Sequence, residues 1–127
     1  MNKFSHTLTD ILLLVSYISN MLCASKIQHK YYVSSKGAIM AMTRVLSREL
    51  GEDGICVNTI SPGLTMSENV LNSEIWMESR DLNKNTRALK RYQTPDDLIG
   101  TLIFLSSEDS YFMTGQSMVV DGGSANN

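Results

Sequence analysis

The chain has 127 residues, enough to bury one hydrophobic core and to form one domain. Its formal net charge of −2 and its pI near 5.6 exclude the basic footprint of a nucleic-acid-binding protein. Cys23 and Cys56 lie in no Cys-x-x-Cys or metal-ligand spacing, and the only histidines, His6 and His29, are not grouped with them. Because the sequence also shows no secretory signal pattern, we expect free thiols in the cytoplasm, no disulfide and no metal site.

The first predicted element is a strand. The N-terminal segment 1–10 is mostly polar and shows no period, whereas the run from Ile11 to Ile18 is apolar and does not alternate. Such a run is typical of a buried parallel strand, and it is far shorter than the ~20 apolar residues that a membrane span requires. We therefore predict a strand over Ile11–Ser19, with Ser19 at its C-terminal end, and no contact with a membrane.

A long helix is predicted after a loop at Asn20–Lys30. Apolar residues recur at helical spacing through Tyr31–Leu50, and Gly51 is placed to end the helix with a left-handed cap. The residues that carry this period are Ala38, Ile39, Met42, Val45, Leu46 and Leu50. Small side chains in the first turns would let another element pack closely; they belong to Gly37, Ala38 and Ala41.

The start of this helix has the layout of a proton-transfer site. Tyr32 and Lys36 are four residues apart and share one helix face, and Ser19 lies thirteen residues upstream of Tyr32. The ammonium group of Lys36 can favour the ionised form of the phenol. Lowering the pKa of a tyrosine from about 10 by roughly 3 units needs about 4 kcal/mol, which is a known size of shift. Tyr31 has no lysine four residues on, so we expect it to be a packing residue.

The rest of the chain predicts two more strands and another helix. Ile55–Ile60 reads as a buried strand that Ser61-Pro62-Gly63 breaks, and a polar stretch with weak helical character follows at 64–92. A helix then starts with Thr94 as N-cap, Pro95 at the first helical position and Asp97 in the capping-box position, and runs to about Ser106. The last strand is Ser117–Asp121.

This order of elements predicts an α/β fold. Strand, helix, strand, helix and strand, joined by right-handed crossovers, give about three parallel strands with helices on both faces. The strand that begins at Ile11 would lie at an open, hydrophobic edge, which predicts poor solubility or association. Asn58 would satisfy backbone groups in a loop, and Asp121-Gly122-Gly123 would close the fold.

Three motifs, in order, resemble the C-terminal half of the short-chain dehydrogenase/reductase family. They are Y-V-S-S-K-G-A at 32–38, G-I-C-V-N-T-I-S-P-G at 54–63 and F-M-T-G-Q-S-M-V-V-D-G-G at 112–123. The resemblance implies a truncated Rossmann-like, doubly wound parallel sheet as one partial domain over 1–127, with a substrate lid at 64–92. The first glycine of the chain is Gly37, so the glycine-rich turn that would hold the pyrophosphate of NAD or NADP has no counterpart.

The resemblance also assigns roles to the candidate site residues. Tyr32 would be the general acid or base, and Lys36 would lower its pKa and bond to the nicotinamide ribose. Ser19 would bond to the substrate oxygen, an assignment that rests on its spacing because Ser16 lies in the same strand. Tyr32 and Lys36 would thus also contact the cofactor.

The remaining cofactor contacts would follow the second strand. In the family the backbone after Pro62-Gly63 meets the nicotinamide carboxamide, and here the chain continues with Thr65 and Ser67, where contacts are expected. A second copy would pack on the Tyr31–Leu50 helix and on the C-terminal helix and strand, giving a homo-oligomer. A basic cluster near the lid is expected to be solvated surface, with a phosphate or acyl-carrier contact as the alternative. It comprises Arg87, Lys90 and Arg91.

Two functions follow from these observations. The first is an NAD(P)-dependent oxidoreductase that acts on a small alcohol or ketone, of the 3-oxoacyl reductase or sugar and polyol dehydrogenase kind. The second is a non-catalytic remnant or oligomerisation fragment that binds no nucleotide. The residues do not decide between NAD and NADP, because the position that reads the ribose would precede the matched region.

Overall fold

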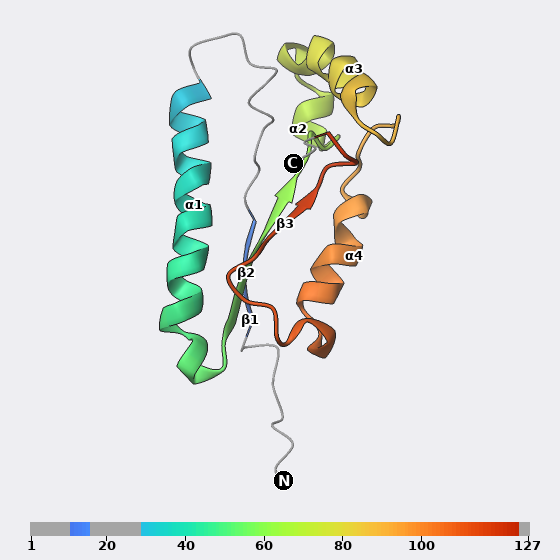
Figure 1. The fold of residues 1–127 in the computed structure, drawn as a ribbon. Coiled ribbons are helices and arrows are strands. Elements are labelled where there is room, and N and C mark those ends of the chain that lie inside the picture. The colour runs from blue at the N-terminus through green and yellow to red at the C-terminus, as the bar shows by residue number, and fades with distance from the viewer. Residues whose placement is uncertain (1–10, 16–28, 125–127) are drawn as a thin grey trace.

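The computed structural model describes residues 11–15 and 29–124, which fold into three strands and four helices (Figure 1). In chain order these are β1 (Ile11–Val15), α1 (His29–Glu49), β2 (Cys56–Pro62), α2 (Glu68–Leu71), α3 (Met77–Thr86), α4 (Asp96–Leu105) and β3 (Ser117–Val120). Short 3-10 turns lie at Gly51–Asp53, Glu74–Trp76 and Glu108–Ser110. No helix within these described ranges is long and apolar enough to cross a bilayer.

The three strands form one parallel sheet in the order β1-β2-β3. Ile11 lies opposite Cys56 at one end of the β1–β2 pair, and Pro62 lies opposite Val120 at the end of the β2–β3 pair. The predicted α/β fold with a small parallel sheet is therefore confirmed. Within the described sheet β1 is an outer strand, as expected from the sequence.

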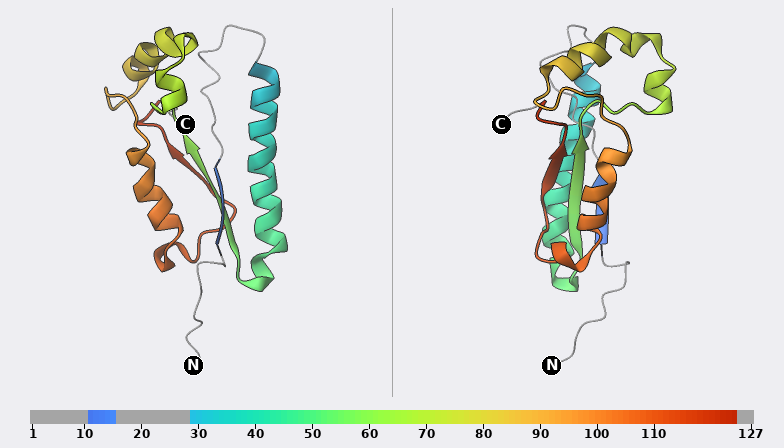
Figure 2. Two further views of the ribbon diagram at one scale, coloured as in Figure 1. Left: turned by 180° about the vertical axis from the view of Figure 1, so that it is seen from behind. Right: turned by 90° about the vertical axis from the view of Figure 1, so that its right-hand side faces the viewer.

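The helices α1 and α4 cover opposite faces of the sheet, and α2 and α3 lie beyond the carboxyl end of β2 (Figures 1 and 2). The central strand carries the core, because β2 is buried at six of its seven positions. The buried apolar side chains among the described residues are Val57, Ile60, Leu64 and Leu105.

Polar side chains also join the layers. Thr43 of α1 and Thr59 of β2 are buried, and their hydroxyl oxygens lie 2.5 Å apart. Asn58 donates from its amide to Met113 O at 2.7 Å and accepts from Gln116 N at 3.1 Å. The expected structural role of Asn58 is confirmed, since it satisfies backbone groups of the loop before β3.

The helix ends differ from the sequence expectation in one place. Gly51 does not adopt the predicted left-handed cap, because a 3-10 turn continues the chain through Gly51–Asp53 and Ile55 N donates to Leu50 O at 3.2 Å. The left-handed residue is Gly54, with φ 78°. The glycine requirement therefore falls three residues later than predicted.

The boundaries of β2 and α4 also shift slightly. Ser61 and Pro62 continue β2 where the sequence predicted a break, because β3 pairs with both of them. At the start of α4 the Asp97 carboxylate accepts from Thr94 N at 2.8 Å, as the capping-box position predicts. Pro95 already has helical angles, φ −54° and ψ −32°, in front of the first helical residue, Asp96.

Candidate functional site

Tyr32 and Lys36 lie in the first two turns of α1, near the carboxyl edge of the sheet (Figure 1). The Nζ atom of Lys36 lies 5.4 Å from the centroid of the Tyr32 ring, and both side chains are half-buried. The helical spacing therefore places the phenol and the ammonium group on one face. Tyr31, expected to pack, is instead 76% exposed.

The pKa of Tyr32 departs from the sequence expectation. Burial raises the pKa of its phenol above the ordinary value, whereas the motif predicted that Lys36 would lower it. The reason is that partial burial removes water from the phenolate and so disfavours the charged form.

Ser19, the third predicted catalytic residue, lies outside the described residues, as does the end of the predicted Ile11–Ser19 strand. The loop predicted at Asn20–Lys30 is described only in its last two residues, which already belong to α1. The catalytic assignment of Ser19 therefore stays a prediction.

The predicted cofactor residues after β2 sit on a tightly built turn. Pro62 and Gly63 are buried, and Gly63 N donates to Val120 O at 2.9 Å. A Cβ atom on residue 63 would lie 2.8 Å from Gln93 Oε1 and 3.0 Å from Arg87 Nη2. Only glycine fits there without displacing a neighbour, so the close packing explains the residue type.

Thr65 and Ser67 continue this turn, and both are half-buried. The Thr65 hydroxyl donates to Gly63 O at 3.0 Å, and Ser67 N donates to Thr65 O at 2.8 Å just before α2 begins. Thr65 also pairs with Gln93 in an isolated parallel bridge, and Met66 N donates to Gln93 O at 2.7 Å. The turn is thus tied to the segment that follows α3.

Arg87 is the residue at this site that sequence reasoning missed. It was expected to be solvated, but it is only 2% exposed. Its Nη2 atom donates to Leu64 O at 2.7 Å and to Gln93 Oε1 at 3.3 Å. No signal in the charge pattern distinguishes it from its neighbours in the cluster, because the acceptor of its shortest hydrogen bond, Leu64 O, comes from the distant turn after β2.

The other members of the basic cluster behave differently. Arg91 binds Asp97 through two hydrogen bonds of 2.7 and 2.5 Å, and Lys90 donates to Asn85 O at 2.7 Å from an exposed position. The Arg91 guanidinium holds the pKa of the Asp97 carboxyl well below its usual range, helped by the Thr94 N–H. The solvated-surface expectation is therefore right for Lys90 and wrong for Arg87.

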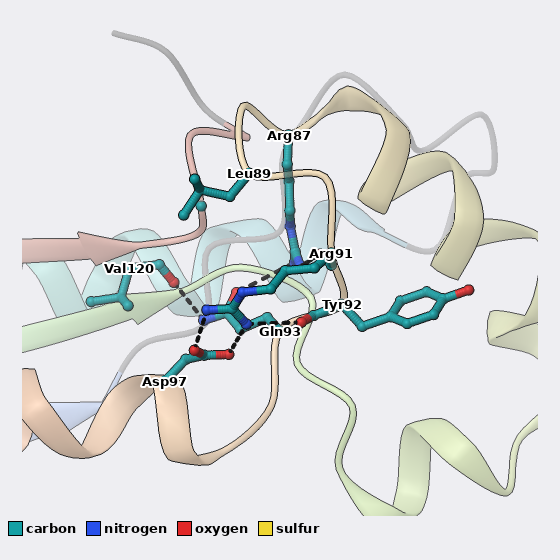
Figure 3. A pocket seen from close by; sticks show the side chains of 8 residues that line it. Arg87, Leu89, Arg91, Tyr92, Gln93, Asp97 and Val120 are labelled. Carbon is teal, nitrogen blue, oxygen red and sulfur yellow. Dashed lines mark hydrogen bonds and ion pairs between the residues drawn. The ribbon is translucent and has the colours of Figure 1, made fainter.

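A pocket of about 220 Å³ opens beside these residues, between the segment after α3, the first turn of α4 and the end of β3 (Figure 3). In Figure 3 the Arg91 fork meets Asp97, and Gln93 reaches toward Val120. The lining residues are Arg87, Leu89, Arg91, Tyr92, Gln93, Asp97, Val120 and Gly122.

The described residues contain no group of three or more His, Cys, Asp or Glu side chains that could hold a metal ion. Cys56 is a free thiol that donates to Tyr111 O at 3.2 Å, and burial raises its pKa. The described residues therefore place neither a metal-binding cluster nor the Cys56 thiol on the face of α1 that carries Tyr32 and Lys36.

Comparison with known proteins identifies the family. The enoyl-(acyl carrier protein) reductase family model matches residues 8–125. The meso-2,3-butanediol dehydrogenase of Serratia marcescens is 35% identical over 94 residues, which cover 73% of this chain and 36% of that enzyme. The chain therefore belongs to the short-chain dehydrogenase/reductase family, and it spans about a third of the length of the curated relatives it matches.

Several solved structures similar to this chain contain nicotinamide cofactors. A blue fluorescent protein from a metagenomic library, in complex with NADPH, has a TM-score of 0.75 and 30% identity over 91% of this chain and 45% of its own. A 4-hydroxyisoleucine dehydrogenase complexed with NADH and succinate has a TM-score of 0.74 and 25% identity, over 91% and 46%. NAD and NADP, the cofactors expected from the sequence, are thus those of its relatives.

Proposed function

We propose that this chain is the part of an NAD(P)-dependent oxidoreductase that carries the acid–base residues for an alcohol or ketone substrate. The single observation that carries the proposal is the placement of Tyr32 and Lys36 on one face of α1 at the carboxyl edge of the sheet. Ligands of open α/β sheets bind at that edge. The bound cofactor would accept or supply the hydride.

Tyr32 is proposed to move the proton. Because burial raises its pKa, the phenol holds its proton at neutral pH and can donate it to a carbonyl oxygen, as ketone reduction requires. Lys36 would then stabilise the phenolate that remains. Ser19 would bond to the same substrate oxygen, and a small diol or sugar is the proposed substrate class, since a butanediol dehydrogenase is among the relatives.

The donor set of this chain fits the nicotinamide end of the cofactor. A phenol and an ammonium group share the face of α1, and the polar turn at Thr65 and Ser67 follows β2 at the same edge. These residues, with the backbone of Pro62 and Gly63, would hold that end. The described residues include no glycine-rich turn before α1 that would hold the pyrophosphate.

We further propose that the chain is a cytoplasmic homo-oligomer whose lid comprises residues 64–92. Large apolar side chains lie exposed on α1 and α4 and fit the expected contact between copies. They belong to Met42, Val45, Ile99, Leu102 and Ile103. Light scattering after size exclusion measures this directly, and a monomer at micromolar concentration would contradict it.

A second candidate function is a non-catalytic fragment that associates through the same helices and binds no nucleotide. The exposed apolar side chains on α1 and α4 favour it, because they fit association between copies and require no nucleotide. Both candidates predict association, so the oligomeric state does not separate them. Nucleotide binding does.

The experiment is a titration of the purified chain with NADH and with NADPH, followed by the fluorescence of the reduced nicotinamide. Saturable binding that is weakened in the Lys36→Met variant would support the oxidoreductase. An exposed lysine on another element, replaced in Lys90→Met, is the matched control and should bind like the wild type. A chain that is folded by circular dichroism and binds neither nucleotide would favour the fragment.

A further inference from the structure

The turn after β2 is held by a buried polar network that the motifs did not predict. Gly63, Leu64, Arg87 and Gln93 are all buried. A charged side chain is almost never this deeply buried unless its donors are satisfied. The position of Arg87 therefore calls for a reason beyond its place in a basic cluster.

The geometry of Arg87 supplies one reason. Arg87 directly follows α3, and its guanidinium bridges the backbone of Leu64, the side chain of Gln93 and, at 3.4 Å, Arg91 O. A guanidinium offers a planar fork of donors, so one side chain can bind acceptors from two segments at once. Arg87 thus joins the segment after α3 to the turn after β2.

Gln93 makes a second link in the same network. Its Nε2 atom donates to Val120 O at 2.7 Å, its Oε1 atom accepts from Arg87, and its backbone O accepts from Met66 N. It therefore connects the end of β3 to Met66 in the turn and to Arg87, which itself binds Leu64. The hydrogen bond from Leu89 N to Gly122 O, 2.9 Å long, fixes the same segment against the chain after β3.

We infer that Arg87 and Gln93 are positioning residues that fix the turn 63–67 at the carboxyl edge of the sheet. The inference rests on the proposed function for its consequence, which is that the turn is already in place when the nicotinamide binds. Preorganised binding groups lower the entropic cost of association. Loss of the Arg87 guanidinium should therefore make the turn 63–67 more mobile and, as a consequence, weaken nucleotide binding.

The test compares Arg87→Met with Arg91→Met. Both variants remove a guanidinium from the same pocket, but the hydrogen bonds of the Arg91 side chain go to Asp97 on α4 and to Tyr92 O, outside the turn. Backbone hydrogen exchange at 63–67 should become about tenfold faster in Arg87→Met, and should change less than twofold in Arg91→Met. The dissociation constant for NADH should rise about tenfold in Arg87→Met alone.

If Arg87→Met does not fold, the same measurements are made on Arg87→Lys. Lysine keeps the charge but not the planar fork, so it can bind Leu64 O or Gln93 Oε1 and should give an intermediate exchange rate. A merely structural role would instead change exchange throughout α1 and β2 to the same degree. Uniform acceleration, or unchanged exchange at 63–67, would overturn the inference.

The two proposals fail in distinguishable ways. If the wild-type chain binds no nucleotide, the proposed function falls, while selective exchange at 63–67 in Arg87→Met still supports the positioning role. If the wild type binds NADH and Arg87→Met frees the turn without weakening that binding, the turn is not a cofactor contact. That result would overturn the consequence drawn for the nicotinamide.

Discussion

Two regions meet at the carboxyl edge of the sheet, and they are built in opposite ways. The turn after β2 is buried at Gly63 and Leu64, and Arg87 and Gln93 bind it through hydrogen bonds. The start of α1 is largely exposed, with Tyr32 and Lys36 half-buried between exposed neighbours. Neighbouring side chains hold the atoms of the first region in place, whereas Tyr32 and Lys36, which we propose take part in catalysis, are partly exposed to solvent.

Because of this difference, we expect the turn after β2 to contribute to the stability of the fold and the start of α1 to contribute to the proposed chemistry. The Arg87 guanidinium is buried and donates from Nη1 and Nη2, so it is costly to disturb, because breaking one of these bonds leaves a polar group without water. A half-exposed phenol has fewer contacts to lose. Substitutions in the turn should therefore act on folding, and substitutions at the start of α1 should act on turnover with little change in folding.

The largest expected effect belongs to Tyr32→Phe. In any preparation that turns over an alcohol or ketone, we expect kcat to fall about a thousandfold, within the range that general acid–base catalysis supplies. NADH affinity should stay within twofold, because only the hydroxyl is removed. Tyr31→Phe is the matched control, since Tyr31 is exposed and adjacent. Steady-state kinetics measure both, and full turnover by Tyr32→Phe would sink the catalytic assignment.

The next largest effect is on the free energy of unfolding, and it is tested by replacing one glycine in each region. Gly63→Ala places a Cβ atom within 3.0 Å of three side-chain atoms, so we expect a loss of about 1–3 kcal/mol in the free energy of unfolding. Gly37 lies in α1 with nothing within 4 Å of such an atom, so Gly37→Ala should stabilise the chain by about 0.5–1 kcal/mol. Urea denaturation measures both. Equal effects would contradict the contrast between the regions.

The contrast also marks what the sequence could predict. Regular elements were predictable because α1 has a helical period and β1 is a continuous apolar run, and the alternation of strands and helices favours a parallel sheet. The shared face of Tyr32 and Lys36 follows from helix geometry alone. Local chemistry likewise predicted the capping bond of Asp97. These features depend on residues that are close in the sequence.

The failures depend on residues that are distant in the sequence. Arg87 is buried because Leu64 O, 23 residues away, accepts its hydrogen bond, and nothing in a charge cluster reveals such a partner. The pKa of Tyr32 is raised by burial, which tertiary packing determines and helical spacing does not. Gly51 does not have a positive φ, because a 3-10 turn continues the chain after α1 and the left-handed residue is Gly54.

A smaller effect tests the packing of α1 away from its reactive end. Thr43→Val removes the hydroxyl that contacts Thr59 in the interior, and we expect a loss of about 1 kcal/mol in the free energy of unfolding. Ser35→Ala removes an exposed hydroxyl that donates to Tyr32 O at 2.7 Å in the first turns of α1. Urea denaturation should show little change for that control, and a larger loss for Ser35→Ala than for Thr43→Val would contradict the distinction.

The smallest expected effect depends on pH and concerns the Arg91–Asp97 contact. The pKa of Asp97 is lowered in the folded chain, chiefly by its hydrogen bond to Arg91, so the ionised carboxylate stabilises the fold above its ordinary pKa of about 3.9. This contribution is lost as the pH falls through that value toward the lower folded pKa. The difference in unfolding midpoint between the wild type and Asp97→Asn should therefore be small at pH 7 and shrink below about pH 4. A difference that stays unchanged from pH 4 down to about pH 2 would show that Asp97 acts through packing and not through its charge.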